Sequence, residues 1–72
     1  MFIELTRVDR LNNTTYPVYV NVDTIEAIEP DLENFGRCTI TGKNVFYEID
    51  GTYEDIKNRI AYVIHSQQNQ SL

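Results

Sequence analysis

The segment at residues 17–30, PVYVNVDTIEAIEP, changes its hydrophobic period partway along, and this change constrains the fold more than any other feature. Its apolar residues first alternate as in a β-strand and then follow at intervals of three, as on a helix: Val18 and Val20, then Val22, Ile25 and Ile28. A helix here would be short and would end against Pro30, where the preceding residue avoids helical angles. We therefore interpret the segment as two strands joined by a turn.

The turn is predicted at residues 21–24, because Asn and Asp side chains bond nearby backbone groups and favour turns. An extra residue in this turn resets the alternation, so that Ile25 begins a new strand on the core side together with Ala27. The same alternation places Glu26 and Ile28 on the opposite face, either beneath a helix or at a subunit contact.

Strand-like alternation also occurs on both sides of this segment. Besides the strand that starts at Ile25, strands are predicted at residues 2–8, 17–21, 38–40 and 45–49. The polar residues 9–16 are typical of a loop or a hairpin tip, in which Asn12 and Asn13 can adopt a positive φ. A second hairpin turn is predicted at residues 41–44, with Gly42 supplying a positive φ.

The clearest element is an amphipathic helix near the end of the chain. Thr52 is a favoured N-cap residue, and it is followed by an apolar stripe at helical spacing: Tyr53, Ile56, Ile60, Val63 and Ile64. The predicted fold is α+β, with about five short antiparallel strands in a meander or small barrel-like sheet, followed by one C-terminal helix. It forms a single domain over residues 1–67, and the polar residues 68–72 are expected to fray.

Charge and cysteine content narrow the classes of partner. The 72 residues carry a net charge of −5, which disfavours nucleic acid and anionic membranes because both require clustered Lys and Arg. No apolar run approaches the ~20 residues of a membrane-spanning helix, so we predict no membrane insertion. The first residues lack the pattern of a signal peptide, and Cys38, the single cysteine, has no internal disulfide partner. We therefore expect a cytoplasmic protein.

The sequence contains no pattern typical of catalysis, metal binding or phosphate binding, and we predict no catalytic residues, no metal site and no cofactor. His65 is the only histidine and has no neighbouring ligand partner. Cys38 has the alternation of a small core residue rather than the surroundings of a nucleophile. The three glycines are isolated, and each is explained by a turn.

Aromatic and acidic residues are the candidates for a binding surface. The five tyrosines and three phenylalanines exceed what so small a core needs, and such residues are enriched at interfaces, although some exposed aromatics are ordinary. The acidic residues between positions 26 and 33 form either a solvated face or a docking surface for a basic partner. The predicted interface residues are Tyr19, Glu26, Ile28, Glu29, Asp31 and Phe46.

Several of these segments, in this order, resemble the FlbD/SwrD family of small flagellar and swarming-motility proteins. The resemblance covers about residues 1–60 and rests on Ile3, Leu5, Thr6 and Arg7, on Val20, Asn21, Ile25, Ile28 and Glu29, on Thr39, Gly42 and Lys43, and on Thr52, Asp55 and Ile56. The connection at residues 8–16 is longer than the family's first hairpin, and the family's basic tail is missing. Similar short proteins also occur in bacteriophages, and the resemblance implies a non-enzymatic accessory protein.

Two functions follow from these observations as hypotheses. The first is a small cytoplasmic accessory protein that self-associates as a homo-oligomer or binds a protein partner. The second is a phage-type effector that inhibits a host protein through its acidic face, or that sequesters a small ligand between subunits.

Overall fold

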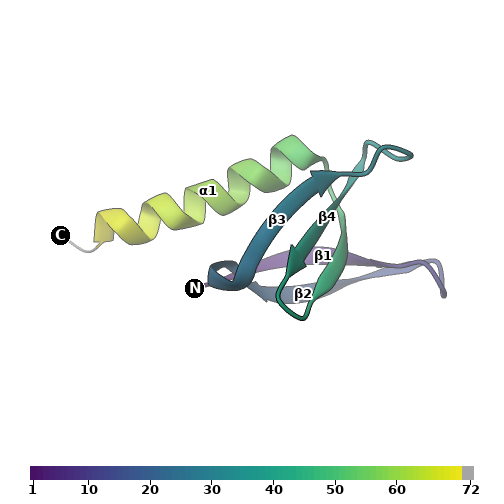
Figure 1. The fold of residues 1–72 in the computed structure, drawn as a ribbon, viewed down its shortest axis with the longest axis horizontal. Helices are drawn as coiled ribbons and strands as arrows, with labels where there is room; N and C mark the ends of the chain where they lie inside the picture. Colours follow the sequence, from purple (N-terminus) through teal and green to yellow (C-terminus); the bar gives the residue numbers. More distant parts are fainter. Residues whose placement is uncertain (71–72) are drawn as a thin grey trace.

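A computed structural model describes residues 1–70 of the chain, with side chains described through Ser66. The elements, labelled in Figure 1, are the strands β1 (Phe2–Asp9) and β2 (Thr14–Asn21), the 3₁₀ helix η1 (Val22–Thr24), the strands β3 (Ile25–Pro30), β4 (Arg37–Gly42) and β5 (Phe46–Asp50), and the helix α1 (Tyr53–Gln70). The strands form one antiparallel sheet in the order β2-β1-β5-β4-β3. The predicted α+β fold is therefore confirmed.

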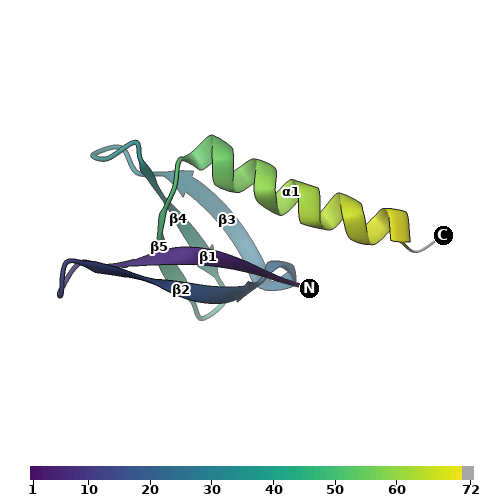
Figure 2. The same ribbon diagram turned by 180° about the vertical axis from the view of Figure 1, so that it is seen from behind.

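The sheet is sharply twisted, so that its two parts enclose the core. β1 and β2 pair along their whole length, but the register between β1 and β5 holds one pair, Arg7 opposite Ile49. The β1–β2 hairpin consequently crosses the β3–β4–β5 layer, as Figures 1 and 2 show from opposite sides. The core combines side chains of the strands, η1 and α1: Ile3, Leu5, Val20, Val22, Cys38, Ile40, Ile49, Ile56 and Ile60.

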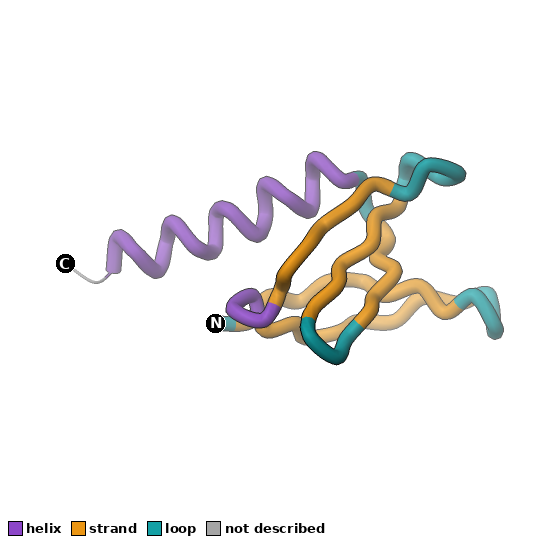
Figure 3. Tube along the Cα trace, in the orientation of Figure 1, coloured by secondary structure: helices purple, strands orange, loops and turns teal. Residues whose placement is uncertain are grey.

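The predicted joint between two strands is confirmed at η1, seen in Figure 3 as the short helical turn that leads into β3. Asn21 caps this turn, because its Oδ1 accepts a hydrogen bond from the Asp23 amide at 3.1 Å. The Thr24 hydroxyl donates to the Asn21 carbonyl at 2.8 Å. Val22 is buried in the core, and its amide donates to the Met1 carbonyl at 2.8 Å. The polar cap and the buried valine together turn the chain from β2 into β3.

The predicted alternation along β3 is wrong, because the strand contains a β-bulge. Ile25 lies opposite Gly42, but the register shifts before Ala27, which leaves Glu26 as the extra residue. Ile28 is therefore paired with the buried Ile40 and packs against the core, as Ile25 also does. Ala27, predicted to face the core, precedes the core-packing Ile28 and by alternation lies on the opposite face. Ile28, predicted to share a face with Glu26 opposite Ile25, packs against the same core as Ile25.

Of the two turns for which a positive φ is predicted, one has it and the other does not. Asn13 has a φ of 53°, which confirms the prediction for the first hairpin tip. Gly42 has no positive φ; among the described residues the glycine with one is Gly51, at 146°. Gly42 is needed for space, because a Cβ there would lie 2.5 Å from the Thr24 carbonyl oxygen.

Helix α1 starts beside the end of β3, runs alongside the sheet and then extends beyond it (Figure 1). The Asp55 amide donates to Thr52 Oγ1 at 3.1 Å, which confirms the predicted N-cap. Ile56 and Ile60 are buried, whereas Ile64 is 39% exposed. The fraying predicted for residues 68–72 overlaps the end of α1 at Gln70, and Ser71 and Leu72 lie outside the described residues. Within the described residues, no helix has both the length and the apolarity to cross a membrane.

Candidate interaction surface

Two loops lie at the end of the molecule opposite the C-terminus, as both ribbon views show (Figures 1 and 2). They are the tip of the β1–β2 hairpin, residues 10–13, and the β3–β4 loop, residues 31–36. Arg10 links them, because its Nη2 lies 3.6 Å from Asp31 Oδ2. We call these two loops together the loop end.

An aspartate fixes the backbone of the first loop. Asp9 Oδ1 accepts hydrogen bonds from the amides of Leu11 and Asn12 at 3.0 and 3.2 Å, and Asn12 Nδ2 donates to Asp9 Oδ2 at 2.9 Å. The hydrogen bonds from Asn12 and Leu11, together with the charge of Arg7, hold the pKa of Asp9 below its ordinary value. The tip is thus a defined turn built on an ionised carboxylate.

An aspartate also fixes the backbone of the second loop. Asp31 Oδ1 accepts hydrogen bonds from the amides of Glu33 and Asn34 at 2.9 and 3.2 Å. Asn34 Oδ1 then accepts from the Gly36 amide at 3.0 Å, and the two ends of the loop are joined where the Asp31 amide donates to the Arg37 carbonyl at 3.2 Å. These bonds hold the backbone of the loop in one conformation.

Large apolar side chains point into solvent from both of these fixed loops. Leu11 is 93% exposed on the first loop, and Leu32 and Phe35 are 78% and 73% exposed on the second. A single exposed apolar residue is ordinary, but three on two ordered loops that are linked at one end form a candidate contact surface. Loops on a rigid scaffold are also where proteins most often place their binding residues.

Ion pairs fasten the loop end to the sheet through a group that we call the arginine clasp, consisting of Arg10, Asp31, Arg37 and Glu48. Arg10 donates two hydrogen bonds to Glu48, one of them from Nη2 to Oε1 at 2.8 Å, and Glu48 in turn raises the pKa of Arg10. Arg37 Nη1 lies 3.6 Å from the same Oε1. The side chain of Glu48 is 11% exposed and that of Asp31 is 13% exposed, so both carboxylates are largely covered. Guanidinium groups therefore lie against both carboxylates, while Arg10 itself is 66% exposed.

Two further carboxylates remain exposed beside the apolar side chains. Glu29 is the last residue but one of β3, Glu33 lies within the second loop, and both are exposed. Neither forms an ion pair with another residue in the part of the chain that the structure describes. The loop end therefore combines apolar side chains with an excess of negative charge.

The structure brings together some of the predicted interface residues and separates others. Asp31 belongs to the loop end, where it acts through its hydrogen bonds and its ion pair, and Glu29 lies on β3 just before the second loop. Glu26 is exposed on the bulge of β3, and Ile28 packs against the core. The loop-end residues Leu11, Leu32 and Phe35 were not predicted, although a large apolar residue inside a polar loop is the signal that marks each of them.

The two predicted aromatic residues are exposed, but they do not form one surface. Tyr19 is 69% exposed and stacks on Phe2, with their ring centroids 5.4 Å apart. Phe46 is 64% exposed, and it lines a hollow with residues of β1 and β2, whereas Tyr19 lines a different hollow beside Glu4. Aromatic contact area is thus divided between two places on the molecule.

The described residues contain no group of three or more His, Cys, Asp or Glu side chains that could hold a metal ion. The loop end instead presents exposed apolar side chains on a hydrogen-bonded backbone, together with the exposed carboxylate of Glu33. The resemblance to the FlbD/SwrD family stays a prediction. Comparisons with protein-family models, with curated proteins and with solved structures found no match for this chain.

Proposed function

We propose that this chain is a small, non-enzymatic, cytoplasmic accessory protein that binds a partner protein through its loop end. The observation that carries the proposal is the ordered β3–β4 loop, which holds Leu32 and Phe35 in solvent at 78% and 73% exposure. A surface whose backbone is already fixed loses little conformational entropy when it binds, so more of the contact energy contributes to affinity.

The charges of the loop end suggest the chemistry of the partner. Glu29 and Glu33 are exposed next to the apolar side chains and are not in ion pairs with described residues. A partner with an apolar pocket flanked by Lys or Arg complements such a surface, and the opposite charges would accelerate the encounter. A bacterial accessory protein and a phage-type effector that inhibits a host enzyme would both use this surface, and they differ in the identity of the partner.

A separate observation favours self-association, the other form of this function. β2 is an edge strand of eight residues without a charged side chain, and Tyr16 and Tyr19 are exposed on it. β3, at the other edge, carries Glu26, Glu29, a bulge and a terminal proline, which are the features that discourage strand pairing. Pro17 is the one such feature on β2. Light scattering of the purified chain measures directly whether two copies pair.

The proposed function is tested by affinity capture with immobilised chain and a bacterial lysate, followed by titration of the captured protein after its purification. The double variant Leu32→Ser, Phe35→Ser removes the apolar side chains of the second loop and leaves the Asp31 and Asn34 hydrogen bonds in place. Tyr62→Ser is the matched control, because Tyr62 is also 73% exposed but lies on α1.

We expect the double variant to bind the partner at least about tenfold more weakly than the original chain, while the control binds normally. Glu33→Lys should weaken the same interaction, and increasingly so at low salt, where exposed charges are screened least. A partner that binds the double variant and the original chain equally well would refute the loop end as the binding surface.

A further inference from the structure

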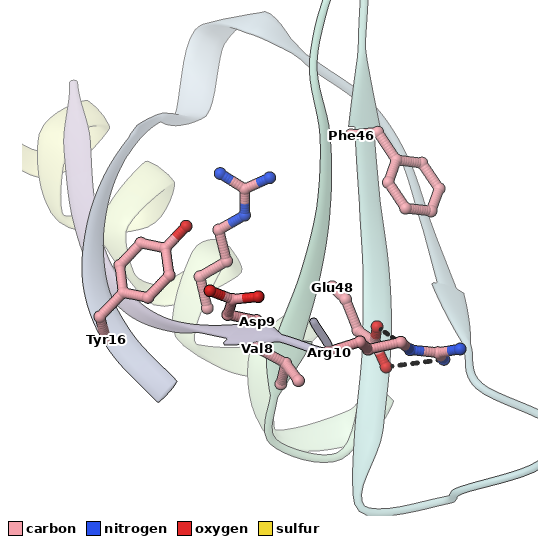
Figure 4. Close-up of a pocket in the computed structure, with 7 residues that line it drawn as sticks. Val8, Asp9, Arg10, Tyr16, Phe46 and Glu48 are labelled. Carbon is pink, nitrogen blue, oxygen red and sulfur yellow. Dashed lines mark hydrogen bonds and ion pairs between the residues drawn. The ribbon is translucent and has the colours of Figure 1, made fainter. Parts of the chain in front are cut away.

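A hollow lies where β1 and β5 diverge beyond their one paired position at Arg7 and Ile49. It has a volume of about 330 Å³, and it is lined by residues of β1, β2 and β5 together with Arg10 (Figure 4). Figure 4 shows Tyr16 at one side of this space and Phe46 and Glu48 at the other. Hollows of this size accommodate small molecules, for which typical sites begin at about 300 Å³.

Arg7 contributes an unused set of hydrogen-bond donors to this hollow. Its guanidinium carbon lies 4.9 Å from the centroid of the Tyr47 ring and 6.0 Å from that of Tyr16, so the two rings contact the cation. The guanidinium donates no hydrogen bond to, and forms no ion pair with, any residue within the described part of the chain. Aromatic rings occupy the faces of a guanidinium and leave its N–H donors, which lie in its plane, available.

The other charged groups of the hollow already have partners. Glu48 accepts two hydrogen bonds from Arg10 and also lies near Arg37. Both oxygens of Asp9 accept hydrogen bonds within the first loop. The charge of Arg7 favours the ionised form of Asp9, but its guanidinium N–H donors have no hydrogen-bond partner among the described residues. The ligand that matches such a guanidinium is an oxyanion.

Aromatic surface is exposed in the same hollow. Phe46 is 64% exposed and Tyr16 is 41% exposed, and both line the space that Arg7 lines. An aromatic ring on a ligand can stack against these side chains at low entropy cost.

We propose that the hollow binds a small planar aromatic molecule that carries one oxyanion, either a carboxylate or a phosphate monoester. The oxyanion accepts hydrogen bonds from the Arg7 guanidinium, and the aromatic ring lies against Phe46. Arg7 is the binding residue, and Tyr16 and Tyr47 hold its guanidinium in place.

The test is a titration of the full ¹⁵N-labelled chain followed by NMR. The probes are benzoate for the carboxylate, phenyl phosphate for the phosphate monoester, and benzyl alcohol and inorganic phosphate for the ring and the anion alone. At least one of the two aromatic anions should shift the amide signals of Arg7 and Phe46 saturably, with a Kd below about 1 mM. Which of the two binds more tightly identifies the oxyanion.

Arg7→Gln should weaken the binding of that probe at least about tenfold, because charge-assisted hydrogen bonds are lost. Arg59→Gln is the matched control and should bind normally, because Arg59 donates to the Glu4 carbonyl and does not line the hollow. Phe46→Ser removes the proposed ring contact at an exposed position. This variant tests the proposal if Arg7→Gln fails to fold. The proposal is overturned if neither aromatic anion gives saturable shifts at 10 mM (about tenfold above the expected Kd), if Arg7→Gln binds like the original chain, or if inorganic phosphate binds as tightly as phenyl phosphate.

Discussion

Beneath α1, Ile56 and Ile60 pack against the buried strands, whereas at the loop end Arg10 pairs with Glu48 and Asp31. Burial of one isoleucine stabilises a fold by about 1.5–3 kcal/mol, but exposed ion pairs contribute little and are weakened by salt. The difference separates two tasks in a very small domain. The apolar side chains packed beneath α1 supply most of the stability. The polar contacts of the loop end fix the conformation of its loops without burying the side chains that they present.

The largest effect on stability is expected from a change in the core beneath α1. Ile56→Ala should lower the free energy of unfolding by about 2–5 kcal/mol, because Ile56 is 1% exposed and its loss leaves a cavity beneath α1. Urea denaturation followed by circular dichroism measures this loss. Ile64→Ala, at 39% exposure on the same helix, should cost much less. Equal losses in the two variants would show that the part of α1 beyond the sheet is also buried, for example against a second copy.

A much smaller effect on stability is expected from the arginine clasp. Arg10→Ala removes both hydrogen bonds to Glu48 and the ion pair with Asp31, but Arg37 continues to neutralise Glu48. The denaturation midpoint should fall slightly at low salt, and the difference should shrink at 1 M salt, where the Debye length is about 3 Å. Amide hydrogen exchange should accelerate at residues 10–13.

Lys43→Ala is the control for the clasp, because it removes an equal charge from the turn between β4 and β5. A loss of stability in Arg10→Ala as large as that in Ile56→Ala would contradict the proposed difference between the core beneath α1 and the loop end.

The smallest effect is expected from Asp9, and it depends on pH. The folded-state pKa of Asp9 is lowered below 3.8, so its carboxylate stabilises the fold above that pH and this contribution is lost as the pH falls through the folded-state pKa. Asp9→Asn should therefore melt at a lower temperature than the original chain at pH 6, and the two melting temperatures should converge below pH 3.8. A constant difference between the two proteins over this range would mean that the hydrogen bonds of the first loop do not need the ionised form.

The parts of the fold that follow from neighbouring residues could be predicted from the sequence. The turn capped by Asn21, the positive φ of Asn13 and the helix start at Thr52 each depend on residues within a few positions. The bulge at Glu26 could not be predicted in this way, because it depends on how β3 registers with β4. That one residue reversed the predicted side of Ile28 and Ala27.

The candidate site was less predictable, because its contacts join residues far apart in the sequence. Arg10 and Glu48 are 38 residues apart, and their charges alone did not show that they pair. The acidic residues Glu29 and Asp31 could be singled out from their clustering, but the role of Asp31 in the backbone of the loop required the structure. The hollow at Arg7 depends on the divergence of β1 from β5, which arises from the twist of the whole sheet.

Cys38, the second residue of β4, has no exposed surface, and burial raises the pKa of its thiol. Because the thiolate is the form that reacts, the folded chain should resist alkylation, oxidation and cross-linking between copies. A thiol reagent will then modify Cys38 only when the strands around it separate. The rate of modification therefore measures how often the β3–β4–β5 layer opens, and the chain needs no added label for that measurement.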